Sequence, residues 1–269
     1  TVVWFRFTSA FLTLSLLTLL FRRADFRIFR KAPLLLVLAS LFLGGNYLGF
    51  ISGMKYVSPS TSQVFIQAGP VSFALAGIVI FREKVNWKHL VGFMLVISGM
   101  ALFYSEQIKA LIHAGEDLTR GMILILAGGL SWGVFATMQK KLVQQHPPNQ
   151  LNLFIYAFCA LLLMPFVQFH QLPGLNLPEW GLMYFLGLNT VLAYGSLAFA
   201  IKYTEANRVS VIITLNPVIT FVLMVILGRS GVEWIDAENF SFLSIAGALT
   251  VLTGAVTVIL AGRKRRRTR

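Results

Sequence analysis

Long apolar runs alternate with short polar segments along the whole chain. An α-helix needs about 20 mostly apolar residues to cross the hydrocarbon core of a bilayer, and each run approaches that length. Because a backbone in lipid must satisfy its own hydrogen bonds, the runs predict helices rather than open strands. We expect nine membrane spans, the fourth of which is short and extends back to Trp87: Val2–Leu20, Pro33–Met54, Pro59–Phe81, His89–Tyr104, Gly121–Gln139, Leu151–Phe169, Trp180–Lys202, Asn207–Gly228 and Phe240–Ala261.

The composition supports a membrane location. Of the 269 residues, 57% are hydrophobic and only 12% are charged, and the mean hydropathy is +0.74. Soluble domains carry about 25% charged residues, so this chain has too little polar surface to cover itself and must meet lipid. The net charge of +13 would suggest nucleic-acid binding in a soluble protein. Here the basic residues form short clusters between apolar runs, which favours a role in membrane orientation and argues against a nucleic-acid partner.

The distribution of lysine and arginine predicts the orientation of the spans. If the connecting segments lie on alternate sides, eighteen of the 23 basic residues fall on one side, and the other side keeps only Arg6, Lys55, Lys109, Arg120 and Arg229. Cytoplasmic segments carry the excess of basic residues, so the first side is cytoplasmic. We therefore expect a multi-pass protein of the plasma membrane, in particular the bacterial inner membrane, with a basic cytoplasmic tail at 263–269.

The two halves of the chain resemble each other when one is shifted by 147 positions. The shift pairs Tyr47 with Tyr194, Lys55 with Lys202, Tyr56 with Tyr203 and Pro70 with Pro217. After eight extra residues in the second copy, two glycine pairs match as well, namely Gly92 with Gly247 and Gly99 with Gly254. We expect these glycines to permit close helix contact rather than to bind a ligand.

The matched segments point in opposite directions across the membrane. Lys55 ends a span on the outer side and Lys202 ends one on the inner side, so each repeat must contain an odd number of spans. Five spans fit the second repeat, at 121–262, while the first repeat, at 1–104, shows four, and the connecting loop at 105–120 could hold a surface helix. We expect a missing first helix before Thr1. The sequence thus predicts an all-α polytopic membrane protein with a ten-helix fold of two inverted five-helix repeats.

Uncharged polar residues mark one face of two matched spans. Ser60, Gln63 and Gln67 follow i, i+3, i+7 spacing and share a helix face, and the shift places them on Asn207, Ser210 and Thr214. Unpaired polar groups are costly in lipid, so both faces should point inward. They either line an aqueous substrate cavity, which we favour, or join helices through hydrogen bonds.

Two mid-span prolines and several scattered polar residues extend this hypothesis. Pro70 and Pro217 each remove one backbone hydrogen bond and can act as hinges or as static kinks. Weaker cavity candidates, which packing or interfacial positions would also explain, are Asn46, Tyr47, Trp132, Gln139, Asn189, Tyr194 and Asn216.

The sequence offers no chemistry for an enzyme. The acidic residues and histidines lie in loops or at helix ends, so we expect no ionisable group inside a span, where it would mark a functional site. We find no nucleophile–base arrangement and no metal-ligand cluster, and we expect no catalytic residue, cofactor or metal site. The lone cysteine, Cys159, lies in an apolar run and is predicted to pack there.

Several short motifs, taken in order, resemble those of the drug/metabolite transporter superfamily, specifically its EamA-type members, and the similarity covers nearly the whole chain. They are Phe5-Arg6-Phe7, Ala68-Gly69-Pro70, Arg82-Glu83-Lys84, Gly92 through Gly99, Leu130-Ser131-Trp132 and Leu215-Asn216-Pro217. The resemblance implies ten helices in two inverted repeats and export or exchange of amino acids and other small metabolites through a central cavity. The second repeat departs from the pattern, because Ser230 stands where a glutamate would match Glu83.

Our leading hypothesis is a secondary transporter that exports small polar or zwitterionic metabolites, such as amino acids, by alternating access between the two repeats. Efflux of lipophilic drugs is one alternative, which the aromatic content of 13% permits. A non-transporting membrane scaffold is another. The expected partners are membrane lipid and a small-molecule substrate, and the sequence leaves the oligomeric state open.

Overall fold

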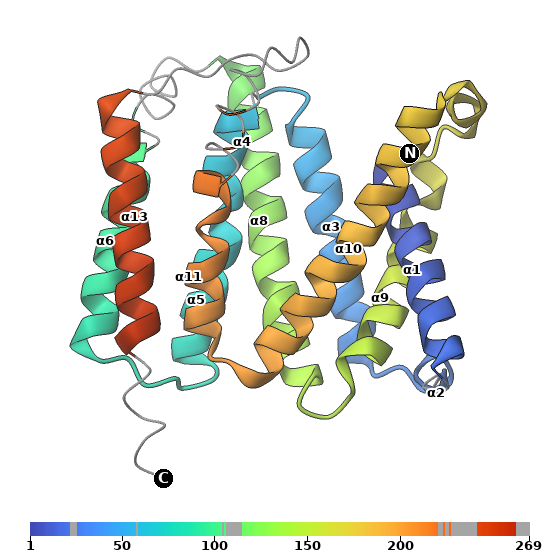
Figure 1. The fold of residues 1–269 in the computed structure, drawn as a ribbon, viewed down its shortest axis with the longest axis horizontal. Helices are drawn as coiled ribbons and strands as arrows, with labels where there is room; N and C mark the ends of the chain where they lie inside the picture. Colours follow the sequence, from blue (N-terminus) through green and yellow to red (C-terminus); the bar gives the residue numbers. More distant parts are fainter. Residues whose placement is uncertain are drawn as a thin grey trace. The chain divides into compact units, whose positions relative to one another are not determined.

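The computed structural model describes residues 1–21, 26–57, 59–103, 105, 115–219, 223, 226 and 241–261. Within these residues the secondary structure is helical, without a β-strand. Five helices are long and apolar enough to cross a membrane by length and composition (Figure 1): α1 (Val2–Leu20), α3 (Leu34–Gly53), α8 (Glu116–Leu142), α9 (Pro148–Leu163) and α10 (Leu177–Tyr203). The protein is therefore an all-α membrane protein, as the apolar runs predict.

Further helices complete the described part of the chain. Four are apolar: α5 (Ala68–Val79), α6 (Trp87–Phe103), α11 (Ala206–Ile213) and α13 (Phe242–Ala261). The remaining elements are short: α2 (Arg27–Arg30), α4 (Pro59–Ile66) and the two 3₁₀ turns η1 (Met164–Phe166) and η2 (Phe169–Gly174).

Most expected spans agree with observed helices. Helix α1 has the expected bounds, α6 begins at Trp87 as expected, and α8 extends beyond its expected bounds at both ends. Helix α9 is shorter than expected, because Pro165 has no N–H for the carbonyl of Leu161 and the chain continues as η1. The end of the eighth span, most of the loop at 105–120 and the basic tail lie outside the described residues.

Two spans that we expected to be continuous are broken. The third consists of α4 and α5, which are separated at Gln67, and in the eighth α11 ends at Ile213 before a turn at 214–215. In each case the α-helix ends four residues before a proline. Pro70 cannot donate to the carbonyl of Ile66, and Pro217 cannot donate to that of Ile213. The repeat therefore places the same interruption at matched positions.

The described residues form two compact units, which we treat separately. Unit 1 contains 1–51 and 127–204, and unit 2 contains 52–126 and 205–269. Each unit takes segments from both halves of the chain, because α3 and α8 pass from one unit to the other. The compact units thus differ from the repeats at 1–104 and 121–262, whose boundaries stay a prediction.

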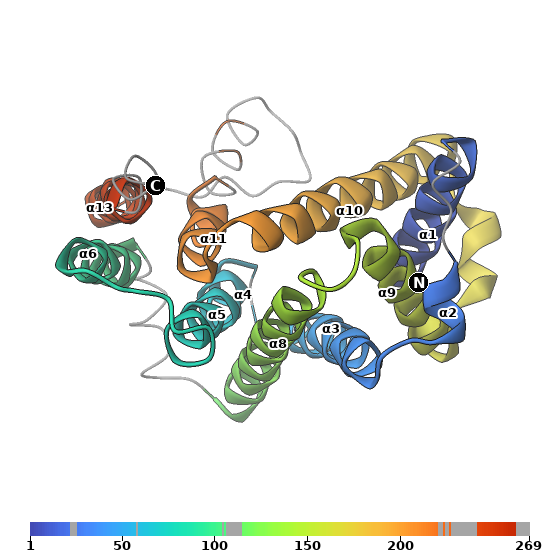
Figure 2. The same cartoon turned by 90° about the horizontal axis from the view of Figure 1, so that it is seen from below.

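In unit 1, α1 packs against both α9 and α10 (Figure 2). Side-chain hydrogen bonds join the unit-1 parts of α3 and α8: Ser131 Oγ donates to the carbonyl of Phe42 at 2.6 Å, and Asn46 Nδ2 donates to that of Gly128 at 2.9 Å. Gly128 permits this approach, since a Cβ there would lie 3.0 Å from the Asn46 carbonyl oxygen. Unit 1 is therefore held together partly by polar contacts inside an apolar bundle.

In unit 2, α6 and α13 pack closely along their length (Figure 1). A Cβ on Gly99 would lie 2.9 Å from the carbonyl oxygen of Gly247, and one on Gly92 would lie 3.0 Å from that of Gly254. Real side chains do not tolerate such approaches to backbone, so only glycine fits. The expectation that these glycines permit close helix contact is confirmed.

Candidate functional site

The two predicted polar faces lie in unit 2, where α5 packs against α11. Gln67, Asn207, Ser210 and Thr214 are buried and Gln63 is half-buried, whereas the side chain of Ser60 in α4 lies outside the described part of the structure. Three of their polar atoms, Gln67 Oε1, Asn207 Oδ1 and Ser210 Oγ, have no hydrogen-bond partner within that part. The two faces thus bring unused hydrogen-bonding groups into the interior of unit 2.

Both faces end at the proline interruptions described above. Gln67 is the residue that separates α4 from α5, and Thr214 begins the turn after α11, where its hydroxyl donates to the Val211 carbonyl at 2.7 Å. Pro70 and Pro217 are buried next to these breaks. Backbone carbonyls without an i+4 donor therefore lie beside the buried polar side chains, an arrangement that discontinuous membrane helices commonly show at binding sites.

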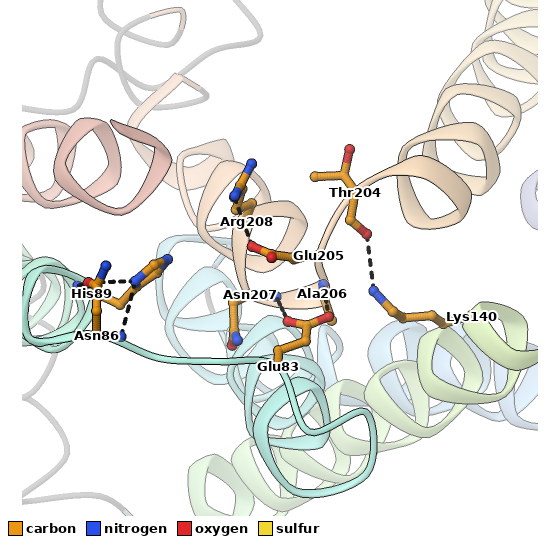
Figure 3. A network of polar contacts seen from close by, with 9 residues as sticks. All are labelled: Glu83, Asn86, His89, Lys140, Thr204, Glu205, Ala206, Asn207 and Arg208. Carbon is orange, nitrogen blue, oxygen red and sulfur yellow. Dashed lines mark hydrogen bonds and ion pairs between the residues drawn. The ribbon is translucent and has the colours of Figure 1, made fainter. Parts of the chain in front are cut away.

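Glu83 caps the start of α11 (Figure 3). Its Oε1 accepts a hydrogen bond from the N–H of Ala206 at 2.6 Å, and its Oε2 accepts one from the N–H of Asn207 at 3.0 Å. The first N–H groups of a helix have no intrahelical partner, and a negative charge there is favoured by the helix dipole. The carboxylate therefore fixes the N-terminal end of the helix that carries Asn207, Ser210 and Thr214.

Two backbone features place Glu83 at this position. Arg82 has a φ of 51°, in the left-handed region that non-glycine residues seldom adopt, and the N–H of Glu83 donates to the carbonyl of Gly77 at 3.0 Å. A Cβ on Gly77 would lie 2.8 Å from Glu83 Oε2, so a larger residue there would displace the carboxylate from its present position. In the sequence, Glu83 stands out only as part of the Arg82-Glu83-Lys84 motif. Its partner lies 123 positions away, so no local pattern reveals the cap.

Figure 3 also shows two polar contacts that cap other helices. Asn86 Oδ1 accepts a hydrogen bond from the N–H of His89 at 3.0 Å near the start of α6. In unit 1, Lys140 Nζ donates to the carbonyl of Thr204, the C-terminal cap residue of α10, at 3.0 Å. A cation at a helix C-terminus is favoured by the dipole, so both contacts have a structural explanation.

Unit 1 contains a cation inside a predicted span, which corrects the sequence analysis. Arg6 counts there as an outer-side residue, and no ionisable group is expected within a span. In the structure Arg6 is half-buried in α1, its Nε donates to Thr190 Oγ1 at 3.2 Å, and its guanidinium carbon lies 5.7 Å from the ring centroid of Tyr47. Thr190 is 1% exposed and lies well inside α10. The guanidinium of Arg6 therefore contacts neighbouring helices of unit 1, while its place on the outer side of the membrane stays a prediction.

Hydrogen bonds extend from this arginine through the core of unit 1. The Tyr194 hydroxyl donates to the Tyr47 hydroxyl at 3.2 Å, and Asn152 Nδ2 donates to the Tyr194 carbonyl at 3.0 Å. Gln139 Nε2 donates to Asn152 Oδ1 at 3.1 Å. Tyr156 joins the same region by donating to the Thr190 carbonyl at 3.3 Å. Asn152 and Tyr156 are absent from the predicted set, although their i, i+4 spacing in an apolar run was a usable signal.

The remaining cavity candidates have less distinctive positions. Asn46 is buried and donates to the backbone of α8, and Trp132 is half-buried in α8. Asn189 and Asn216 are exposed. For all of these residues, a place on the substrate pathway stays a prediction.

Comparisons with known proteins agree with this architecture. The profile of the EamA-like transporter family matches residues 1–105 and again residues 119–260. The "Uncharacterized inner membrane transporter YhbE" of Escherichia coli is 31% identical, over 95% of this chain and 81% of the relative. An "Uncharacterized transporter" of Haemophilus influenzae is 30% identical, over 95% of this chain and 84% of the relative.

Two more distant matches add to these. A "Probable amino-acid metabolite efflux pump" of Salmonella typhimurium is 24% identical, over 89% of this chain and 81% of the relative. One crystal structure superimposes with a TM-score of 0.75 at 16% identity, over 98% of this chain and 88% of that chain, which shows a shared fold. With the family profile matched over nearly the whole sequence, the chain belongs to the EamA-like transporter family.

Proposed function

We propose that this transporter exports small polar or zwitterionic metabolites, amino acids foremost, by alternating access between two inverted five-helix repeats. The observation that carries the proposal is the pair of broken helices in unit 2, whose matched polar faces are buried with unused hydrogen-bonding atoms. Leaving such atoms unpaired in an apolar interior costs about 1–3 kcal/mol each. A transported molecule, or the water that precedes it, would supply the missing partners.

Inverted repeats are supported by contacts between matched residues. The Tyr47 and Tyr194 hydroxyls meet, and these residues are 147 positions apart, which is the shift that aligns the two halves. A residue that touches its own counterpart lies on the two-fold axis that relates two copies. The glycine contacts obey the same symmetry, because exchanging each glycine for its counterpart converts the Gly92–Gly254 contact into the Gly247–Gly99 contact.

Symmetry of this kind suits a transporter. Two copies of one sequence in opposite orientations can adopt two similar conformations, each open to one side, and rocking exchanges them around a midplane site. The proposal includes a bacterial inner-membrane location and a cytoplasmic C-terminus, and the excess of basic residues on one side supports this orientation.

The function is tested by measuring flux in proteoliposomes that contain the purified protein. A panel of labelled amino acids, amines, polyols and lipophilic cations would be offered with and without the protein. We expect protein-dependent flux of at least one polar metabolite and none of the lipophilic cations. Flux of lipophilic cations alone would instead support drug efflux, and no flux of any compound would support a scaffold.

Matched variants distinguish a loss of flux caused by changing the polar face from a loss caused by damage to the fold. Asn207→Ala and Ser210→Ala should lower the flux, because they remove the unpaired groups of α11. Thr253→Ala provides the control, since Thr253 is an exposed polar residue of α13 whose hydroxyl bonds only its own helix. Equal flux in all three variants would contradict the assignment of the polar face to the pathway.

A further inference from the structure

Arg6 is a half-buried cation of unit 1, and the described residues of that unit provide no counter-charge for it. The structure describes one acidic residue in this unit, Glu179. Its side chain accepts the N–H of Asn176 at 2.8 Å, in the capping box that starts α10. Glu179 precedes Thr190, the partner of Arg6, by eleven residues, which is roughly 16 Å along the same helix. The charge of Arg6 is therefore not neutralised by the described part of this unit.

The contacts that Arg6 does make use only part of its hydrogen-bonding capacity. Nε donates to Thr190 Oγ1, and the face of the Tyr47 ring lies against the guanidinium. A guanidinium carries five N–H donors in a planar fork. Within the described residues its two terminal nitrogens make no hydrogen bond. Since an unpaired charge in a membrane span is costly, its presence indicates a functional role.

The surroundings hold the guanidinium in place while leaving that fork unused. Thr190 Oγ1 also donates to the Leu186 carbonyl at 2.8 Å, so the acceptor of Arg6 is itself fixed. Tyr47 is fixed by the Tyr194 hydroxyl at 3.2 Å. With Nε bound to Thr190 and the guanidinium over the Tyr47 ring, the planar pair of terminal N–H groups matches the two oxygens of a carboxylate.

We propose that Arg6 is the substrate-recognition residue for an anionic group, and that the protein transports molecules bearing a carboxylate. This inference rests on the proposed function and narrows its substrate class. The carboxylate pairs with the terminal nitrogens of Arg6, while Thr190 and Tyr47 act as positioning residues. An amino acid meets this requirement, and its carboxamide or the corresponding amine does not.

The test compares each amino acid that shows protein-dependent flux with its own carboxamide, in the wild type and in Arg6→Gln. We expect the wild type to prefer the acid, and Arg6→Gln to lower the flux of the acid by about tenfold or more, as loss of a charge-assisted bidentate contact implies. The flux of the carboxamide should change by less than about twofold, because that contact is absent from the start. The flux of the acid in Arg6→Lys should lie between its values in the wild type and in Arg6→Gln, because an ammonium keeps the charge but lacks the planar pair of N–H donors.

Arg120→Gln is the matched control. Arg120 also lies over a tyrosine ring, at 5.5 Å from the centroid of Tyr56, but it is exposed. Its replacement should leave the preference for the acid unchanged. Thermal unfolding in detergent and the reconstituted amount of each variant identify any loss of folded protein, and the ratio of acid to carboxamide flux is independent of that loss.

The remaining outcomes separate this inference from the proposed function. Flux of amines or polyols without any carboxylate would overturn the inference and leave the transport proposal standing. Equal loss of acid and carboxamide in Arg6→Gln would overturn it as well. If Arg6 instead holds a lipid phosphate, the effect of Arg6→Gln should appear only in vesicles that contain phosphatidylglycerol and vanish in phosphatidylcholine, again contradicting recognition of the substrate. Absence of flux for every compound would contradict both proposals.

Discussion

Units 1 and 2 both bury polar groups in an apolar helix bundle, but the hydrogen bonding of these groups differs between the units. In unit 1, Arg6 lies over the Tyr47 ring, the Tyr47 and Tyr194 hydroxyls are hydrogen-bonded, and Asn152 bonds both the Tyr194 backbone carbonyl and the Gln139 side chain. In unit 2, close glycine contacts and a carboxylate cap join the helices, while Gln67 between α4 and α5 and the polar face of α11 keep unpaired atoms. Polar side chains thus join helices through hydrogen bonds in unit 1, whereas Gln67, Asn207 and Ser210 of unit 2 each keep a buried polar atom without a partner within the described residues.

The largest expected effect concerns the glycine contacts. Gly247→Val should destabilise the protein by about 3 kcal/mol or more, since overpacking usually costs 1–3 kcal/mol and here the new side chain meets backbone. A Cβ at Gly247 would lie 2.7 Å from the Gly99 carbonyl oxygen. Thermal unfolding in detergent measures the loss. Gly195→Val in α10 is the control, because no atom lies within 4 Å of its Cβ; comparable losses for the two variants would show that helix propensity, rather than contact, explains the effect.

The cap of α11 should have the next largest effect. Glu83→Ala leaves the N–H groups of Ala206 and Asn207 without their acceptor, and we expect a loss of about 2–3 kcal/mol, as for hydrogen bonds to charged groups. Hydrogen–deuterium exchange should become faster at the start of α11. Glu205→Gln, which breaks the exposed ion pair with Arg208, should cost less than about 1 kcal/mol. Unchanged exchange in Glu83→Ala would contradict the assigned cap.

In unit 1, Asn152→Ala should cost about 1–3 kcal/mol, because it leaves Gln139 Nε2 without its acceptor in the interior and removes the hydrogen bond to the Tyr194 carbonyl. Thermal unfolding of the single variants and of the Asn152→Ala, Gln139→Leu double variant would measure the coupling. We expect the double variant to lose less than the sum of the single losses. Additive losses would show that the chain of amides does not act as a unit.

The smallest effect on stability is expected for Ser210→Ala. Its hydroxyl has no partner within the described residues, so its removal breaks no hydrogen bond between helices and should leave the free energy of unfolding unchanged or higher. Transport should nevertheless decrease. A strong destabilisation would show that the Ser210 hydroxyl makes a stabilising hydrogen bond, as Asn152 does, and would contradict the difference in hydrogen bonding between the two units.

Much of the fold follows from the sequence because membrane spans are read from local composition. The run at 2–20 gave the bounds of α1, and Trp87 was found as the start of α6. The prolines predicted kinks at the right places. A proline alone predicts a kink. Whether the helix is interrupted completely depends on the backbone turn beside the missing hydrogen bond, and that turn depends on the packing of neighbouring side chains.

The contacts of the candidate site residues were harder to predict from the sequence, because they depend on partners that are distant in the chain. Glu83 and Ala206 meet across 123 positions, and Arg6 and Thr190 across 184. Arg6 also has a sequence position that suits an interfacial cation, since long side chains near a helix end can reach the membrane surface. Its inward direction depends on the packing of α1 against α10. Sequence periodicity assigns a residue to a face, and tertiary structure decides what that face meets.

Helix α11 is held by the Glu83 cap at its start and interrupted by a turn at its end, so its two ends should respond differently to a displacement. Glu83 holds one end to the segment after α5, and the turn at 214–215 interrupts the other end. A continuous α-helix spreads an applied bending load over all its hydrogen bonds, whereas an interrupted one concentrates the rotation where the bond is missing. The stiff segment between the cap and the turn holds Asn207 and Ser210 at constant spacing. We therefore expect a displacement at Pro217 to rotate the chain at the turn at 214–215, while Asn207 and Ser210 keep their relative positions on α11.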